Sequence, residues 1–272
     1  MDSEATQQEL EAGRGYETLF VPALFAPWPR HVLDGAVVQG RAHVLDIACG
    51  SGVLARAAFE RCDKTARVVG LDPAPGMIAA AKEVEPHIEW VVGNAENLPF
   101  DDGTFDHVVS QFGIMFFQDR PKAVSEMYRV TKPGGKLAVA VWHSVDDNPA
   151  YKDIASVLEQ NVSPEAANTV RIPFCLDDPQ KVTQLFSQAG FEDVAFVTKR
   201  EQAEFPNTRT MVEVELRGWL PLFGIHLGEE KISEVLTKSD AVLSKYATSS
   251  GAAVFPTTAY VITAHKPEQP AV

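Results

Sequence analysis

The sequence has 272 residues, of which 45% are hydrophobic and 22% are charged, and it carries a formal net charge of −13. This composition is typical of a globular protein with a buried core and excludes fibrous and low-complexity chains. An acidic chain repels phosphate backbones, and no local basic patch is visible, so we expect no nucleic-acid partner.

The chain shows no segment typical of secretion or of membrane insertion. Residues 1–5, Met-Asp-Ser-Glu-Ala, are acidic and lack the basic-then-apolar order of a signal peptide. The most apolar late stretch, residues 211–227, is interrupted by charged residues, so no stable membrane insertion is expected. The cysteines have no spacing typical of a disulfide or a metal site; they are Cys49, Cys62 and Cys175. We therefore expect a cytoplasmic protein with reduced thiols and no bound metal.

Residues 1–40 predict an N-terminal helical cap. Residues 7–16 are polar, and residues 18–38 mix apolar positions with Pro22, Pro27 and Pro29. Proline interrupts the hydrogen bonds of a helix, so we expect these prolines to break the cap into short helices.

From residue 41 the pattern changes to buried strands that alternate with helices. Strands are expected at residues 42–47, 66–71, 88–92, 105–110 and 136–142, the last after a turn at Pro133-Gly134-Gly135. Helices are expected at residues 53–61, 75–84 and 121–130. Strands separated by helices of this length pair in parallel through right-handed crossovers, which indicates an α/β sheet.

The second half of the chain predicts one more helix and two more strands. Asp177-Asp178-Pro179 is typical of an N-cap followed by proline in the first turn, and Gly190 is a plausible end for this helix. The last strands are expected at residues 191–200 and 252–265. We expect residues 41–272 to form one domain with helical insertions at about 144–176 and 205–250, near the substrate.

The segment Val44–Gly52 predicts a loop that holds a nucleotide-like cofactor. Its glycines, Gly50 and Gly52, let the backbone pass close to a ligand, and the next helix points its first amides at that place. Asp72 ends the second strand, where a carboxylate can accept hydrogen bonds from ribose hydroxyls. The loop alone fits two cofactors, because residues 50–55 also match the dinucleotide fingerprint G-x-G-x-x-G/A.

Three further features favour S-adenosylmethionine over NAD. Asp46 lies inside the glycine motif, Gly93-Asn94-Ala95-Glu96-Asn97-Leu98-Pro99-Phe100 follows the third strand, and Arg129-Val130-Thr131-Lys132-Pro133-Gly134-Gly135 precedes the fifth. Nothing after residue 130 is typical of a second nucleotide-binding half. Over roughly residues 40–145, this ordered set of motifs resembles the class I S-adenosylmethionine-dependent methyltransferases, most of all the broad group of ubiquinone and menaquinone biosynthesis C-methyltransferases.

The resemblance implies a Rossmann-like, doubly wound and mostly parallel seven-stranded sheet, with an antiparallel last strand and helical lid insertions. It implies transfer of a methyl group to a small molecule by in-line displacement, with S-adenosylhomocysteine as product. It leaves open the acceptor, the methylated atom and the oligomeric state.

The resemblance also assigns the cofactor site residue by residue. The methionine end of the cofactor would lie among Asp46, Ala48, Cys49, Gly50, Ser51 and Gly52. Asp72 would bind the ribose, Pro73 and Met77 would flank ribose and adenine, and Gln111 and Phe112 would line the sulfonium end. Two positions depart from the family pattern. Ala48 replaces a glycine, and Asn94, beside the Ala95 amide at the adenine, replaces an aspartate.

Two apolar segments indicate the nature of the acceptor. The first is Phe112, Ile114, Met115, Phe116 and Phe117, and the second is Met211, Leu216, Trp219, Leu220, Leu222 and Phe223. We expect them to face each other around an apolar or aromatic acceptor, and the alternative is that they pack a lid onto the domain. Aromatic residues of the cap are expected to form a second lid; they are Tyr16, Phe20, Phe25 and Trp28. His143 is the candidate general base, and the alternative is an exposed loop histidine.

Two other functions compete with an active methyltransferase. One is an inactive S-adenosylmethionine sensor or partner subunit, and the other is a nicotinamide-dependent oxidoreductase. The glycine loop, Asp72 and the end of the fourth strand are all present in usable form, which favours the active enzyme.

Overall fold

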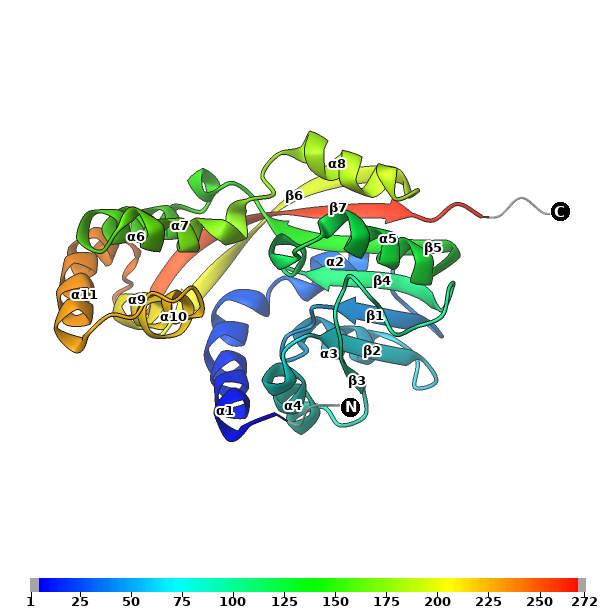
Figure 1. The fold of residues 1–272 in the computed structure, drawn as a ribbon, viewed down its shortest axis with the longest axis horizontal. Coiled ribbons are helices and arrows are strands. Elements are labelled where there is room, and N and C mark those ends of the chain that lie inside the picture. Colours follow the sequence, from blue (N-terminus) through cyan, green and yellow to red (C-terminus); the bar gives the residue numbers. More distant parts are fainter. Residues whose placement is uncertain (1–4, 269–272) are drawn as a thin grey trace. The chain divides into compact units, whose positions relative to one another are not determined.

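The computed structural model describes residues 5–268, so residues 1–4, which bear on the expected lack of a signal peptide, lie outside the described residues. The described chain forms two compact units (Figure 1). Unit 1 contains residues 5–141, 178–199 and 259–268, and unit 2 contains Trp142–Asp177 and Arg200–Thr258. Both expected insertions lie within unit 2.

The described residues form one seven-stranded sheet with the order β3-β2-β1-β4-β5-β7-β6. Its strands are β1 (His43–Ile47), β2 (Arg67–Asp72), β3 (Glu89–Val92), β4 (Phe105–Gln111), β5 (Thr131–Trp142), β6 (Glu192–Phe205) and β7 (Ala253–His265). Strands β1 to β5 pair in parallel, whereas the backbones of Gly134 and Gly135 pair with Lys266 in the antiparallel sense. The predicted Rossmann-like sheet with an antiparallel last strand is confirmed.

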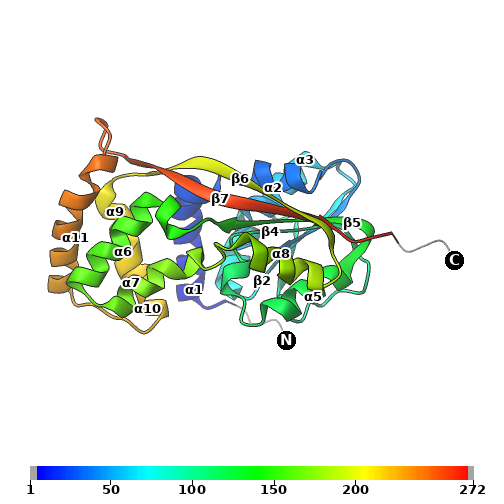
Figure 2. The same cartoon turned by 90° about the horizontal axis from the view of Figure 1, so that it is seen from above.

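The central strands are buried along nearly their whole length because helices cover both faces of the sheet. Every residue of β1 after His43 is buried, and so is every residue of β2 after Arg67. Figure 2 shows α2 (Pro29–Gly35) and α3 (Val53–Arg61) on one face, and α5 (Arg120–Val130) and α8 (Pro179–Gln188) on the other. Helix α4 (Pro75–Val84) packs on β2 and β3.

The N-terminal segment is helical, but Pro22 does not break it as predicted. Helix α1 (Gln7–Gly15) begins at a capping box of Thr6 and Glu9 and continues into a π-helix, η1 (Tyr16–Phe25), which contains Pro22. The wider hydrogen-bond spacing of a π-helix lets the chain pass the proline without ending the helix. The break comes later, before α2 begins at Pro29.

Two strands differ in extent from the prediction, and one of them is β6, which continues to Phe205 beyond the expected end at residue 200. Strand β5 begins at Thr131, before the glycines, and its register with β4 shifts between Phe105 and His107. Gly134 has φ +74°, so the expected turn is an irregularity inside the strand. Helix α8 begins as predicted, because Asp178 accepts hydrogen bonds from the amides of Gln180 and Lys181.

Unit 2 consists mainly of helices, together with the last residues of β6 and the first residues of β7. They are η3 (Val145–Asp147), α6 (Pro149–Asn161), α7 (Pro164–Arg171), η4 (Ile172–Phe174), α9 (Thr208–Val214), the π-helix η5 (Glu215–Trp219), α10 (Leu220–Leu222), α11 (Glu229–Leu243) and η6 (Ser244–Tyr246). Helix α6 packs against α7 and α11, and α9 packs against α11. Asn148 fastens α6 to β7, because its side chain donates to the carbonyl of Thr258 and accepts from its amide.

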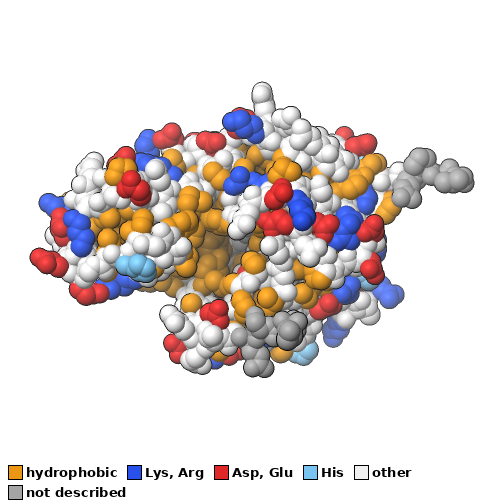
Figure 3. Space-filling model, viewed as in Figure 1, with side chains coloured by type: hydrophobic (Ala, Val, Ile, Leu, Met, Phe, Trp, Pro, Cys, Tyr) orange, Lys and Arg blue, Asp and Glu red, His pale blue; other side chains and the backbone are white. Residues whose placement is uncertain are grey.

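The surface carries charges of both signs (Figure 3), as the 24 basic and 37 acidic residues of the sequence lead one to expect. On the face shown in Figure 3, acidic and basic side chains are interspersed. Among residues 5–268, no helix has the length and apolar character needed to cross a membrane. Within the same described range, no cluster of histidine, cysteine and acidic side chains could hold a metal ion.

Candidate functional site

A cavity of about 400 Å³ lies in unit 1 at the carboxyl ends of the parallel strands. Its walls come from the segments that follow β1, β2, β3 and β4. Open α/β sheets place their ligands at this edge, where the strand order reverses between β1 and β4. The cavity is therefore the candidate site.

The loop after β1 is held open by its backbone conformation. Gly50 has φ +55° and Gly52 has φ +94°, values that favour glycine. A Cβ on Gly52 would lie 2.2 Å from Cη2 of Trp90, so no larger residue fits there. The amide of Gly50 donates to Oδ2 of Asp72 at 2.8 Å, which fastens the loop to the end of β2.

Asp46 lies under this loop as a fully buried carboxyl group. Neither of its oxygens has a hydrogen-bond partner of good geometry. Burial and the neighbouring Asp72 raise the pKa of Asp46 well above its ordinary value, although the Ala55 amide and Arg56 favour the ionised form. Oγ of Ser51 and Oε1 of Gln111 are also buried without partners. Buried polar atoms of this kind fit a polar ligand that brings the missing donors.

Asp72 ends β2 and is only 8% exposed. Its two oxygens accept hydrogen bonds from the amides of Gly50 and Ala74. Burial raises the pKa of Asp72 despite these two bonds. Each carboxylate oxygen keeps a lone pair for a further donor, so Asp72 can still accept a hydroxyl of a ribose.

The segment after β3 forms the opposite wall. Asn94 and Ala95 line the cavity together with Pro73 and Met77. Oδ1 of Asn94 accepts a hydrogen bond from the Glu96 amide at 2.9 Å. This turn fixes the orientation of the Asn94 side chain and leaves its amide group as a donor.

The N-terminal segment covers the glycine loop. Tyr16 and Phe25 line the cavity, and their rings stack with centroids 5.5 Å apart. Nε2 of Gln111 donates to the carbonyl of Phe25 at 3.1 Å, which fastens the segment to the end of β4. Trp28 lies in the core with its ring edge against Phe112, so it belongs to the packing beneath the site.

The structure brings most of the predicted cofactor residues to this one cavity. Those that line it are Asp46, Ala48, Cys49, Gly50, Asp72, Pro73, Met77, Asn94, Ala95, Gln111 and Phe112. Ser51 and Gly52 do not line it and instead shape the loop. Lining residues that the sequence did not single out are Val53, Leu54, Leu71, Ala74, Glu96, Gly113 and Gln118. Glu96 belongs to the motif at residues 93–100, but its side chain accepts hydrogen bonds from the amides of Gln118 and Asp119, more than twenty positions away.

The first apolar segment divides between the cavity and the core. Phe112, Phe116 and Phe117 line the cavity, and Phe116 is 46% exposed. Ile114 and Met115, on the short helix η2 (Ile114–Phe116), are buried instead. Neither of them lines the cavity, because these two consecutive residues pack into the core.

The second apolar segment and His143 belong to unit 2. Of the segment's residues, Met211, Leu216 and Leu220 are buried, whereas Leu222 and Phe223 are exposed. Nδ1 of His143 lies 2.7 Å from a carboxylate oxygen of Asp147. His143 is not among the residues that line the cavity of unit 1.

The sheet is doubly wound, Asp46 in β1 precedes the glycine loop, and Asp72 ends β2. Together with the cavity between them, these features match the class I S-adenosylmethionine-binding fold. The family described as a methyltransferase domain matches residues 45–139. The demethylmenaquinone methyltransferase of Staphylococcus epidermidis is 33% identical over 181 residues, which cover 61% of this chain and 75% of the relative.

The chloroplastic 2-phytyl-1,4-beta-naphthoquinone methyltransferase of Arabidopsis thaliana is 40% identical over 140 residues, covering 48% of this chain and 52% of the relative. Among solved structures, phosphoethanolamine N-methyltransferase 2 of Haemonchus contortus, in complex with S-adenosyl-L-methionine, superimposes with a TM-score of 0.57. That match has 19% identity and covers 97% of this chain and 58% of the other, so it speaks for the fold alone. The chain belongs to the S-adenosylmethionine-dependent methyltransferase family, and it is an enzyme of that family.

Proposed function

We propose that the enzyme methylates a small aromatic acceptor of the hydroquinone type. The observation that carries this proposal is Phe116, a 46%-exposed aromatic side chain that lines the same cavity as the cofactor loop. The buried residues Ile114 and Met115 anchor the turn that presents it. A large, fixed aromatic face suits an aromatic ring, and the sequence relatives named above act on quinone-type molecules by name.

For the cofactor we propose the arrangement that the family pattern implies. The methionine end would lie at residues 46–52 and Gln111, the ribose at Asp72, and the adenine at Met77, Asn94 and Ala95. The buried oxygens of Asp46 and Gln111 without partners, and the amides at the start of α3, support this orientation.

S-adenosylmethionine, when bound, supplies a methyl group on a positively charged sulfur. A ring carbon of a hydroquinone would take up this methyl group and give up one proton, and the electron pair of the former sulfur–methyl bond would remain on sulfur. The residues of the cavity contribute alignment and exclusion of water, through Phe116 on the acceptor and Tyr16 and Phe25 over the loop.

His143 lies in unit 2 and does not line the cavity of the proposed acceptor, so its role as the group that removes the acceptor proton stays a prediction to be tested. Replacement His143→Gln tests this role through kcat and the KM for the acceptor. A general base at this position predicts a fall in kcat of about 10²–10⁴-fold with little change in KM, and an unchanged kcat would remove His143 from the mechanism.

A panel of acceptors incubated with methyl-labelled cofactor tests the proposed function. The panel holds 1,4-dihydroxynaphthalene, a small primary amine and a small thiol. We expect label in the dihydroxynaphthalene alone. Methylation of only the amine or the thiol would contradict the acceptor class, and so would tight S-adenosylhomocysteine binding without turnover of the dihydroxynaphthalene.

A further inference from the structure

The loop after β3 and the loop after β4 line the same cavity and are joined by one carboxylate. Asn94, Ala95 and Glu96 lie on the first loop, and Phe116, Phe117 and Gln118 lie on the second. Oε1 of Glu96 accepts hydrogen bonds from the backbone amides of Gln118 at 3.0 Å and Asp119 at 3.3 Å. Glu96 therefore spans from the adenine wall to the wall that carries the exposed phenylalanine.

The contact is well placed for a carboxylate. Asp119 is the N-cap residue of α5, so the two amides that Glu96 binds lie at the positive end of this helix. Hydrogen bonds from backbone amides to a charged carboxylate are about twice as strong as neutral ones. The amide of Glu96 itself holds Oδ1 of Asn94, so one residue touches both the adenine wall and the start of α5.

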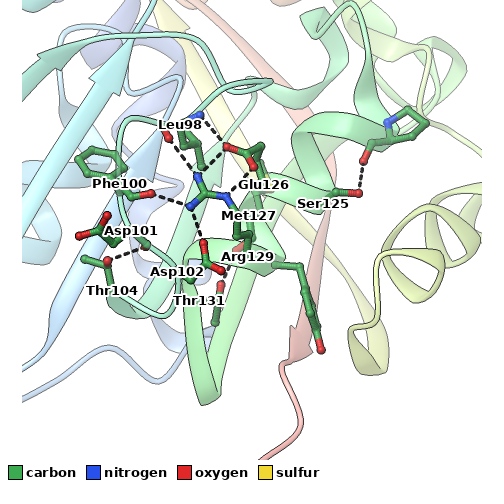
Figure 4. A network of polar contacts seen from close by, with 12 residues as sticks. Leu98, Phe100, Asp101, Asp102, Thr104, Ser125, Glu126, Met127, Arg129 and Thr131 are labelled. Atoms are coloured by element: carbon green, nitrogen blue, oxygen red, sulfur yellow. Dashed lines mark hydrogen bonds and ion pairs between the residues drawn. The ribbon is translucent and has the colours of Figure 1, made fainter.

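Helix α5 fastens the remainder of both loops. Figure 4 shows Arg129 donating to the carbonyls of Leu98 and Phe100, beside its ion pair with Glu126. Oε2 of Glu126 accepts from the Leu98 amide at 2.8 Å. At the other end of the helix, Arg120 donates to the carbonyl of Ile114 at 3.2 Å. The two loops thus share one rigid support, and Glu96 is their direct link at the cavity.

We propose that Glu96 is a positioning residue that couples the adenine end of the cavity to the acceptor wall. A ligand at the adenine end restrains Asn94 further, and through Glu96 it restrains the start of α5 so that Phe116 and Phe117 present a fixed face. Binding of the cofactor therefore strengthens binding of the acceptor, and the reverse holds equally. The inference rests on the proposed function for its acceptor wall, whereas its hydrogen-exchange test does not.

Hydrogen exchange of residues 112–117 with and without S-adenosylhomocysteine tests the coupling. In the wild type we expect the ligand to slow exchange by about fivefold or more, the lower range of typical couplings between sites. In Glu96→Ala we expect slowing of less than about twofold, with Glu96→Gln between the two because its amide oxygen still accepts. Glu126→Gln is the matched control, since Glu126 fastens the same loop without touching Gln118 or Asp119, and it should keep the wild-type response.

Equal slowing in the wild type and in Glu96→Ala would overturn the inference, as would an equal loss in Glu126→Gln. Calorimetry separates this failure from that of the proposed function. If the wild type does not bind S-adenosylhomocysteine, the cofactor site is wrong; if it binds without slowing residues 112–117, only the coupling is wrong. With 1,4-dihydroxynaphthalene as probe, Glu96→Ala should raise KM about tenfold and leave kcat within about twofold, a split that general unfolding would not give.

Discussion

Two residues that line the cavity hold left-handed backbone conformations without being glycine. Ala48 has φ +56° and Phe112 has φ +57°, and they follow the adjacent strands β1 and β4. The two loops approach so closely that a Cβ on Gly113 would lie 2.5 Å from Cβ of Ala48. Backbone strain of this kind costs about 1–3 kcal/mol per residue and persists where the surroundings enforce it, most often at functional sites.

Replacement of Ala48 by glycine should relieve part of this strain. We expect Ala48→Gly to raise the free energy of unfolding by about 0.5–1 kcal/mol, the left-handed penalty less the added entropy of the unfolded chain. Urea denaturation measures the change. Ala81→Gly, in the buried interior of α4, is the matched control and should destabilise by about 1 kcal/mol. A loss of stability in Ala48→Gly would show that the packing of the alanine methyl contributes more free energy than the left-handed backbone costs.

The buried carboxyl of Asp46 makes stability depend on pH. Because the pKa of Asp46 is raised in the folded state, the folded protein binds this proton more tightly than the unfolded chain. The contribution of Asp46 is therefore present at acid pH and is lost as pH rises toward its raised pKa. Relative to the wild type, Asp46→Asn should gain stability as pH rises above the ordinary pKa of an aspartate, about 4, at up to about 1.4 kcal/mol per pH unit until the pH passes the raised pKa.

Denaturation curves at several pH values check this expectation, with the exposed Asp63→Asn as control. The same Asp46→Asn variant should bind S-adenosylhomocysteine about tenfold more weakly, because the amide replaces one of the two carboxyl oxygens by a donor. A stability difference that shrinks as pH rises would contradict the raised pKa.

At the scale of elements, the N-terminal segment is joined to the cofactor fold by a close helix contact. A Cβ on Gly13 of α1 would lie within 2.4 Å of the Gly76 carbonyl oxygen at the start of α4. Arg14 and Glu83 form an ion pair beside this contact, and Glu17 pairs with Arg56 of α3. These contacts hold Tyr16 over the glycine loop. Its ring lies so close there that a Cβ on Gly50 would be 3.5 Å from it.

Gly13→Ala should separate α1 from α4 and loosen the segment that covers the cavity. Overpacking of this kind costs about 1–3 kcal/mol. Gly15→Ala is a sharp control, because its Cβ would meet nothing within 4 Å and its backbone is already helical, so it should stabilise by about 0.5–1 kcal/mol. Limited proteolysis within residues 5–28 measures the loosening, and equal cleavage of both variants would show that the glycine contact does not hold the segment.

The elements also show which features the sequence could predict. The bounds of α3 and α4 agree with the prediction, because their starts depend on local signals: the glycine turn before Val53 and the proline in the first turn at Pro75. The π-helix through Pro22 and the irregularity at Gly134 were not predictable from such signals, since neighbouring elements enforce them. The role of Glu96 was hidden for the same reason, because its partners come from a loop on another strand.

At the scale of the whole molecule, the chain divides its tasks between two units. The cavity is lined by residues of unit 1 alone. Unit 2 contains the helices of the insertions and its own buried groups, among them Glu215, whose pKa burial raises to about 8. A ligand of the cavity therefore binds groups of one unit, and its stabilising effect on the two units need not be equal.

Saturation with S-adenosylhomocysteine should reveal this division in hydrogen exchange. At a ligand concentration about one hundred times Kd, linkage adds about 2.7 kcal/mol to the free energy of every opening that destroys the site. We expect this full increase for the amides of β1, β2 and β4, and a smaller one for the amides of α6, α7 and α11, which can open without disturbing the cavity walls. An equal increase in both sets would mean that the units open together, because only then does the ligand protect residues that do not form its site.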